Sequence, residues 1–319
     1  MTTSQLWTNP TIHKDTIFDG MNKSMAEFTE TFKARLPNIN TAKTLFCFSD
    51  YSGEEEQSNH FVYSFLILNG DNLPEWNKQR QALRNDILSD GRRVSYKNYR
   101  DKLSEKFIEK YLEIADDLDG YLITISVSKK LGSIFENNSA IDLTNPDFIK
   151  YSSWTKDTIE KTFRIMHFLS LFVSGLSSEY QNLFWITDND KIAANNERIT
   201  QLTELFASVM AIYLNHNLGH LKVGTTKSDD GSRLIEDLCS ITDLAAGSYS
   251  DQHKTIETPS NKDLADIFWI YSPDYKKKTK NLIWWLSTSN KKLCKLCFKI
   301  TENGDGKSGS SFYHFFNRE

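Results

Sequence analysis

Residues 45–53, LFCFSDYSG, place an aspartate at the end of an apolar run and a glycine shortly after it. A short run of large apolar residues that is bounded by a turn signal predicts a buried strand, here over 44–49. A second aromatic and β-branched run over 61–68 predicts an antiparallel partner, because only a short polar loop separates the two. The sheet is therefore expected to begin with a hairpin that presents Asp50 at the end of its first strand.

The rest of the chain alternates apolar runs with amphipathic stretches. Further strands are expected over 93–97, 121–127, 183–187, 220–224, 282–286 and 293–300. Helices are expected over 21–36, 73–88, 99–115, 154–176, 195–214, 232–249 and 262–271. Strands separated by helices of this length predict an α/β fold, in which a mixed sheet is flanked by helices.

The composition changes toward the C-terminus. Residues 254–299 hold ten lysines and four acidic residues, although the whole chain has a net charge of −4. We therefore divide the chain into an N-terminal extension (1–40), an α/β domain (41–253) and a basic, aromatic-rich α+β extension (254–319). Within the α/β domain, residues 129–178 are expected to form a mainly helical insertion.

Two further aspartates have settings that resemble that of Asp50. Asp188 directly follows the apolar run that ends at residue 187, and Asp243 lies inside the predicted helix over 232–249. Ligands gather at strand ends in open α/β sheets, so Asp50 and Asp188 would lie side by side if their strands are neighbours. Asp243 falls on the helix face opposite Leu238, and it therefore faces either this site or water.

Carboxylates from separate elements are the ligands that Mg²⁺ or Mn²⁺ uses in phosphodiester-cleaving enzymes. The predicted metal ligands are Asp50, Asp188 and Asp243, with Glu54 as a further candidate four residues after Asp50. Asp190 competes with Asp188 for the same role. A lone aspartate after a strand is more often a turn residue, so the chemistry of these residues leaves both readings open.

Lysines and aromatic residues interleave in the C-terminal extension. Lys276, Lys277, Lys278 and Lys280 are followed by Trp284 and Trp285. Such a surface can pair with phosphates and stack on bases, which makes nucleic acid, DNA or RNA, the expected partner. The tryptophans can equally anchor the extension to the core.

The four cysteines and the chain start point to a cytoplasmic protein. Cys294 and Cys297 would fall on opposite faces of one strand, which favours structural cysteines over a metal or redox pair. No apolar leader or membrane-spanning run is visible, so we expect a soluble protein without a membrane partner.

Over residues 44 to about 250 the motifs resemble those of the DUF3800 group, which is related to the ribonuclease H-like nucleases. Its first strand ends in Asp-Glu-Ser-Gly, matched here by Asp50, Ser52 and Gly53. Its late helix carries Gln-Leu-Ala-Asp-Leu-x-Ala-Gly, matched by the residues Asp243, Leu244, Ala246 and Gly247.

The resemblance implies a ribonuclease H-like fold for 41–253 and metal-ligand roles for the three aspartates. It also implies that Lys97 contacts the scissile phosphate or orients water, and that the protein serves bacterial defence or mobile elements. Tyr51 stands where the group has glutamate, so one ligand is missing unless Glu54 replaces it.

Three functions follow from these patterns. The leading one is a divalent-metal-dependent nuclease. The alternative is a non-catalytic subunit that binds nucleic acid or protein and keeps the ribonuclease H-like fold. A third is a nuclease that is active only in a complex, with a protein partner or further copies of the chain docked on the aromatic tail over 312–316.

Overall fold

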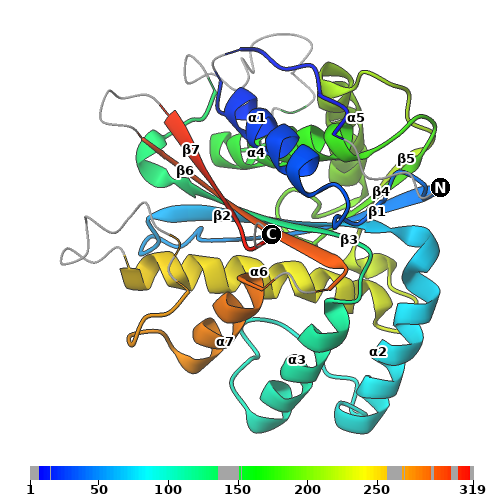
Figure 1. Ribbon diagram of the computed structural model, residues 1–319, viewed down its shortest axis with the longest axis vertical. Coiled ribbons are helices and arrows are strands. Elements are labelled where there is room, and N and C mark those ends of the chain that lie inside the picture. The colour runs from blue at the N-terminus through cyan, green and yellow to red at the C-terminus, as the bar shows by residue number, and fades with distance from the viewer. Residues whose placement is uncertain are drawn as a thin grey trace.

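The computed structural model describes residues 7–14, 16–135, 151, 153–256, 268, 270–288, 291–302 and 308–316. In this part of the chain a mixed sheet of seven strands runs through the centre of the molecule (Figure 1). Its strands, in order across the sheet, are β5 (Leu221–Thr225), β4 (Asn182–Thr187), β1 (Thr44–Ser52), β2 (His60–Asn69), β3 (Gly120–Ser128), β6 (Leu293–Glu302) and β7 (Ser308–His314). The predicted α/β class with a mixed sheet is confirmed.

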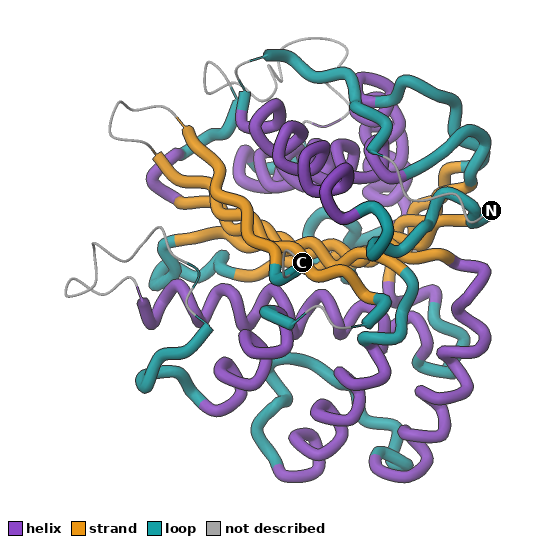
Figure 2. The backbone as a smooth tube through the Cα atoms, viewed as in Figure 1, coloured by secondary structure: helices purple, strands orange, loops and turns teal. Residues whose placement is uncertain are grey.

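Helices cover both faces of this sheet (Figure 2). On one face lie α1 (Ile17–Phe32), α4 (Lys156–Leu176) and α5 (Asn196–Tyr213). On the other face lie α2 (Leu73–Ile87), α3 (Lys102–Ala115), α6 (Leu234–Ile256) and α7 (Lys277–Leu286). None of the helices in the described part of the chain combines the length and the apolar character that a bilayer crossing requires.

Strand β1 lies near the middle of the sheet, antiparallel to β2 and parallel to β4. Side chains alternate between the two faces of a strand. Leu45 and Cys47 therefore enter the core beneath α1, α4 and α5, whereas Phe48 packs into the core on the α6 side. Asp50 comes two residues after Phe48 and lies on the α6 side as well.

Two predicted strands are wrong. Residues 282–286 belong to α7, where Leu282, Ile283 and Leu286 are buried at helical spacing. A short apolar run fits a strand or a helix, and packing against α6 decides between them. Residues 93–97 form a loop, and the Tyr96 N–H donates to a side chain of α6 instead of a neighbouring strand.

The C-terminal extension continues the central sheet. Strand β6 runs parallel to β3, with Leu296 opposite Ile123, and β7 pairs antiparallel with β6. The division of the chain at residue 253 stays a prediction, but these strands share the core of the α/β domain. The helix predicted over 262–271 lies outside the described residues, apart from 268, 270 and 271.

The ends of the chain are tied into the same core. The aromatic tail over 312–316 packs against α1, where the half-buried Phe312 ring and the buried Phe316 ring each contact Phe28. At the N-terminal end, Trp7 lies against Gly175 of α4, where an added Cβ would come within 2.2 Å of the indole ring. The four cysteines are buried and unlinked, and Cys294 and Cys297 enter different core clusters as expected for opposite faces of β6.

We expect Leu296→Ala to lower the free energy of unfolding by about 2–5 kcal/mol, the usual cost of a cavity in a core. The control is Trp284→Ala in the same extension, whose side chain is 63% exposed and should change stability by less than about 0.5 kcal/mol. Urea denaturation followed by circular dichroism measures both. A separate early transition for the extension in the Leu296→Ala variant would contradict a shared core.

Candidate active site

Asp50 lies inside β1, two residues before the strand ends, on the face that α6 covers. Its half-buried carboxylate accepts a hydrogen bond from the backbone N–H of Tyr51 at 2.6 Å. Burial raises the pKa of this carboxyl well above its ordinary value, and the negative charges of Asp243 and Asp188 raise it further. Strand β1 thus places the Asp50 carboxyl in surroundings that disfavour its ionised form.

Asp188 directly follows β4, whose last residue is paired with the residue before Asp50. The parallel register therefore puts the two aspartates at adjoining positions on neighbouring strands, as their strand ends predict. The Asp188 carboxylate is exposed, and it accepts hydrogen bonds from the N–H of Asn189 at 2.8 Å and the hydroxyl of Thr226 at 3.2 Å.

Asp243 lies in α6 and faces this pair of strands rather than bulk water. It is half-buried and accepts a hydrogen bond from the backbone N–H of Tyr96 at 2.5 Å. Burial, and then the charge of Asp188, raise its pKa to about 6. Because each carboxylate perturbs another, Asp50, Asp188 and Asp243 form one electrostatic cluster, which we call the acidic site.

The donors of the acidic site fit a divalent metal ion in their chemistry. Mg²⁺ and Mn²⁺ prefer carboxylate oxygens, and a cation would relieve the charge repulsion that raises the two pKa values. Within the described ranges, however, no group of three or more His, Cys, Asp or Glu side chains is already arranged to hold a metal. The carboxylates are engaged by N–H donors instead, so the ion would have to draw them together.

Tyr51, the residue after Asp50, points away from the acidic site. Its hydroxyl lies 2.6 Å from the Ser49 hydroxyl and 3.1 Å from that of Thr187, on the opposite face of the sheet from Asp50. A side chain at position 51 therefore faces α4 instead of α6. Its identity does not change the carboxylates that converge on the other face.

Glu54 lies with Lys161 of α4 rather than with the three aspartates. The two side chains form an ion pair, and Lys161 also binds Asp190 at 2.5 Å. The Lys161 ammonium lies 4.7 Å from the centre of the Tyr51 ring, on the face opposite the acidic site. Of the predicted ligand set, Asp50, Asp188 and Asp243 lie within electrostatic range of one another, without forming a ready metal site within the described residues, and Glu54 and Asp190 lie elsewhere.

Two lysines act on the acidic site through their charge, Lys278 on Asp243 and Lys161 on Asp50. Lys97 is exposed in the turn after Tyr96. The charge of Lys278 lowers the pKa of Asp243, against the larger effect of burial. Its ammonium lies 3.2 Å from the Tyr96 carbonyl oxygen and 3.7 Å from the centre of the Tyr96 ring. The sequence offers no signal for this approach, because the two segments are far apart along the chain.

The other predicted nucleic-acid-binding lysines lie along α7. Lys276 precedes the helix, Lys277 pairs with Glu105 of α3 at 2.6 Å, and Lys280 lies over the Tyr271 ring at 4.5 Å. All three are exposed.

Tyr96 is a residue of the site that sequence reasoning missed. Its hydroxyl donates to Asp251 at 2.6 Å, and its ring lies over Gly247. A Cβ added at Gly247 would come within 2.4 Å of that ring, so the glycine one turn after Asp243 admits the side chain whose N–H binds the carboxylate. The spacing of Asp243 and Gly247 is the signal that could have indicated a large neighbour.

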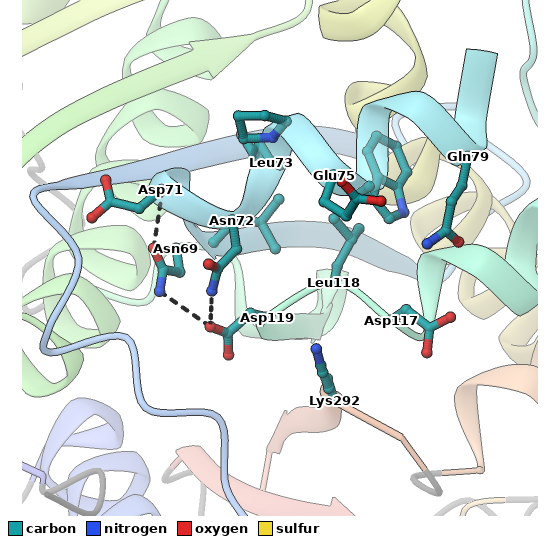
Figure 3. Close-up of a pocket in the computed structure, with 13 residues that line it drawn as sticks. Asn69, Asp71, Asn72, Leu73, Glu75, Gln79, Asp117, Leu118, Asp119 and Lys292 are labelled. Carbon is teal, nitrogen blue, oxygen red and sulfur yellow. Dashed lines mark hydrogen bonds between the residues drawn. The ribbon is translucent and has the colours of Figure 1, made fainter. Parts of the chain in front are cut away.

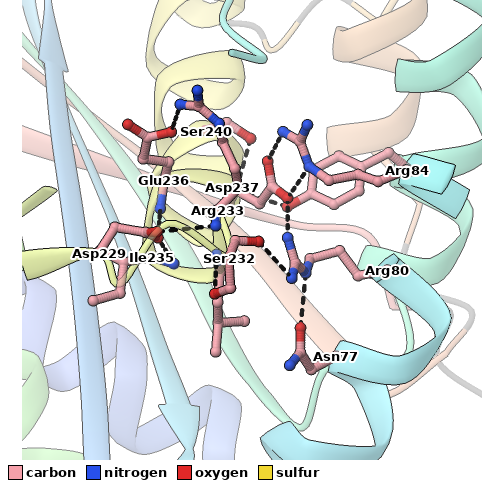
Figure 4. A network of polar contacts seen from close by, with 12 residues as sticks. Asn77, Arg80, Arg84, Asp229, Ser232, Arg233, Ile235, Glu236, Asp237 and Ser240 are labelled. Carbon is pink, nitrogen blue, oxygen red and sulfur yellow. Dashed lines mark hydrogen bonds and ion pairs between the residues drawn. The ribbon is translucent and has the colours of Figure 1, made fainter. Parts of the chain in front are cut away.

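The start of α6 is fixed by a buried ion cluster (Figure 4). The Asp237 carboxylate accepts hydrogen bonds from Arg80 at 2.5 Å and from Arg84 at 2.6 Å, and Tyr111 donates to its backbone carbonyl at 2.6 Å. Asp229 accepts from the N–H of Ile235 at 2.8 Å and satisfies the first turn. These contacts set the position of the helix six residues before Asp243.

Two cavities lie away from the acidic site. One of about 450 Å³ opens at the far end of β2, where the amides of Asn69 and Asn72 donate to Asp119 at 3.1 and 2.7 Å (Figure 3). Another of about 710 Å³ lies on the Tyr51 face of β1. Neither is lined by any of the three aspartates.

Comparisons with known proteins identify no family. No family model matches the chain, and no curated protein matches it in sequence. Among solved structures, the chain is similar to the ribonuclease H2 from Pyrococcus horikoshii OT3, with 12% sequence identity and a TM-score of 0.35 over 76% of this chain and 86% of that one. A TM-score of this size does not establish a shared fold.

We expect Asp237→Asn to lower the free energy of unfolding by about 3–5 kcal/mol, because two buried guanidinium groups would lose their counter-charge. The control is Asp90→Asn, which breaks an exposed pair with Arg92 and should leave stability unchanged. Denaturant unfolding measures both. Equal losses in the two variants would contradict the dependence of α6 on the buried cluster.

We expect Asp243→Asn to stabilise the fold at pH 8 and to lose this advantage below about pH 4. The folded-state pKa of about 6 lies above an unfolded value of about 3.9. The wild-type carboxyl therefore loses stability as the pH rises through 6, by at most about 3 kcal/mol. The asparagine cannot ionise, and its oxygen can still accept the Tyr96 N–H.

Urea unfolding at pH 4, 6 and 8, in the absence of divalent metal, measures the effect of Asp243→Asn. The control is Asp117→Asn, at an exposed carboxyl outside the acidic site, which should show no such dependence. A stability difference between Asp243→Asn and wild type that is the same at all three pH values would show that folding does not raise the pKa of Asp243.

Proposed function

We propose that this protein is a divalent-metal-dependent nuclease of the ribonuclease H-like type. The observation that carries the proposal is the placement of Asp50, Asp188 and Asp243 on two neighbouring strands and one helix, where burial and neighbouring negative charges raise the pKa of Asp50 and of Asp243. Carboxylates that cluster in a half-buried place are costly unless a cation joins them. Their position at adjoining strands agrees with the role that the resemblance implies for the same three residues.

In the proposed reaction, Asp50, Asp188 and Asp243 would hold Mg²⁺ or Mn²⁺, whose positive charge would activate a water molecule and neutralise the phosphate. The oxygen of that water would bond to phosphorus while the bond from phosphorus to the leaving sugar oxygen breaks, and the leaving oxygen would take up a proton from solvent. Tyr96 orients the Asp243 carboxylate through its backbone N–H. Lys278, whose charge already acts on Asp243, pairs with a phosphate oxygen of the substrate. Lys97 remains a proposed contact to the nucleic acid from its exposed turn.

The motif glycines have structural roles that support the proposed place in the DUF3800 group. Gly53 has a φ of 83°, and an added Cβ would come within 2.0 Å of the His60 carbonyl oxygen. Gly247 admits the Tyr96 ring beside Asp243. Gly53 thus requires glycine for its backbone conformation, and Gly247 requires it for the room that it leaves to the Tyr96 ring. A cytoplasmic role in bacterial defence or mobile-element biology is the setting that this resemblance suggests.

A second candidate function is a non-catalytic subunit that binds nucleic acid or protein. One observation favours it: each of the three carboxylates already accepts a backbone N–H, from Tyr51, Asn189 or Tyr96. Such hydrogen bonds can satisfy an acidic cluster that no longer binds metal.

To test the nuclease, purified protein is incubated with labelled single- and double-stranded DNA and RNA in Mg²⁺, in Mn²⁺ and in a chelator. We expect cleavage that requires the metal and falls at least about 100-fold in Asp50→Asn, since even outer-shell partners of a metal contribute about 10- to 100-fold. Asp117→Asn should keep full activity.

Metal binding gives a second readout that does not depend on the substrate. Mg²⁺ or Mn²⁺ should raise the Tm of the wild type and not that of Asp50→Asn. Cleavage by neither metal, together with an unchanged Tm, would exclude the nuclease and favour the binding subunit.

A further inference from the structure

Helix α7 carries an exposed stripe of two lysines and an aromatic residue. Lys277, Lys280 and Trp284 follow one another at intervals of three and four residues, so they share one face of the helix. The Trp284 side chain is 63% exposed, and Tyr271, whose ring lies 4.5 Å from the Lys280 ammonium, is 57% exposed. We call these four residues the α7 stripe.

Trp285, the residue after Trp284, anchors α7 to the core and serves as a comparison. Trp285 is buried, its indole N–H donates to Asp116 at 2.8 Å, and Lys295 lies over its ring at 4.6 Å. Together with Leu282 and Ile283 it attaches α7 to the core. Trp284 is on the outer side of the same helix, so its indole does not serve that attachment.

The α7 stripe is continuous with the acidic site. Lys278, next to Lys277 in the helix, has its ammonium 3.2 Å from the Tyr96 carbonyl, and the Tyr96 N–H binds Asp243. The Tyr96 hydroxyl also lies 3.1 Å from that of Thr279 in α7. Lys278, Thr279 and Tyr96 therefore connect α7 with Asp243.

The chemistry of the stripe fits a strand of nucleotides. The helix has four lysines at or just before its first turn and no acidic residue. The pair of Lys277 with Glu105 is exposed, so phosphate can compete for the lysine at little cost. An exposed indole beside lysines offers a stacking surface for a base, and only unpaired bases present a free face for it.

We propose that α7 binds single-stranded nucleic acid, with bases stacked on Trp284 and Tyr271 and phosphates paired with Lys277 and Lys280, and that it feeds this strand to the acidic site. If the protein is the proposed nuclease, single-stranded nucleic acid is its substrate class. The binding itself does not depend on the proposed function; only the description of the bound strand as a substrate does. A duplex keeps its bases stacked inside and gains from the lysines alone.

The test uses the full chain carrying Asp50→Asn, so that nothing is cleaved while binding is measured. Fluorescence anisotropy with labelled 20-nucleotide single strands of DNA and RNA, and with the matching duplexes, gives Kd over a range of salt concentrations. We expect Trp284→Ala to weaken single-strand binding about 5- to 100-fold and Trp284→Phe to keep most of it. Duplex binding should not change with either substitution.

The matched control is Tyr180→Ala. Tyr180 is 72% exposed, but it precedes β4 and so lies at the opposite end of that strand from Asp188. It should leave Kd unchanged. Lys277→Ala and Lys280→Ala should each reduce the slope of log K against log salt by roughly 0.7 for single strands.

Several outcomes would overturn the inference. The first is an equal loss of single-strand affinity in Trp284→Ala and Tyr180→Ala. The second is an equal loss of affinity for single strands and for duplexes in Trp284→Ala. The third is a folded protein that binds neither single strands nor duplexes. If the wild type cleaves nucleic acid and Trp284→Ala binds normally, this inference fails and the nuclease stands. If single strands bind through Trp284 but the wild type cleaves nothing, the nuclease fails and this inference stands.

Discussion

Helix α6 is held against α2 by one carboxylate, Asp237, that is buried between the guanidinium groups of Arg80 and Arg84 (Figure 4). A buried carboxylate is stable only beside its positively charged partners. The contacts of Asp237 with the two arginines therefore fix the position at which α6 begins. Asp243 follows six residues later, less than two turns along the same rigid element. The acidic site therefore depends on an ion cluster that takes no part in it.

Successive side chains of strand β1 point to opposite faces of the sheet and make different kinds of contact there. Asp50 meets Asp243 and Asp188 on the α6 side, where burial raises the pKa of its carboxyl. Tyr51 turns to the α4 side, beneath the Lys161 ammonium. Adjacent residues thus serve opposite faces of the sheet, and a substitution at one need not disturb the other. The side chain at position 51 is for this reason no part of the acidic site.

The C-terminal extension both continues the core of the molecule and forms part of its exposed surface. Strands β6 and β7 extend the central sheet, and α7 packs on α6. The charge of Lys278 in α7 acts on Asp243, while the Trp284 side chain is exposed. A segment set apart by its composition is thus joined to the core on one side and offers a basic, aromatic surface on the other.

The local pattern of the sequence was enough to predict the α/β class, the hairpin that starts the sheet and the positions of Asp50 and Asp188 at the ends of apolar strand segments, whereas the pairing of those two strands was decided by the tertiary structure. Those features follow from periodicity and turn residues, which act over a few positions. Residues 282–286 were predicted as a strand because a short apolar run fits either structure, and only the contact with α6 decides for a helix. Tertiary structure also decided that Tyr96 and Lys278 approach Asp243 and that Glu54 pairs with Lys161. These contacts join segments far apart in the chain, so no local pattern encodes them, and they form only when the sheet and its helices pack together.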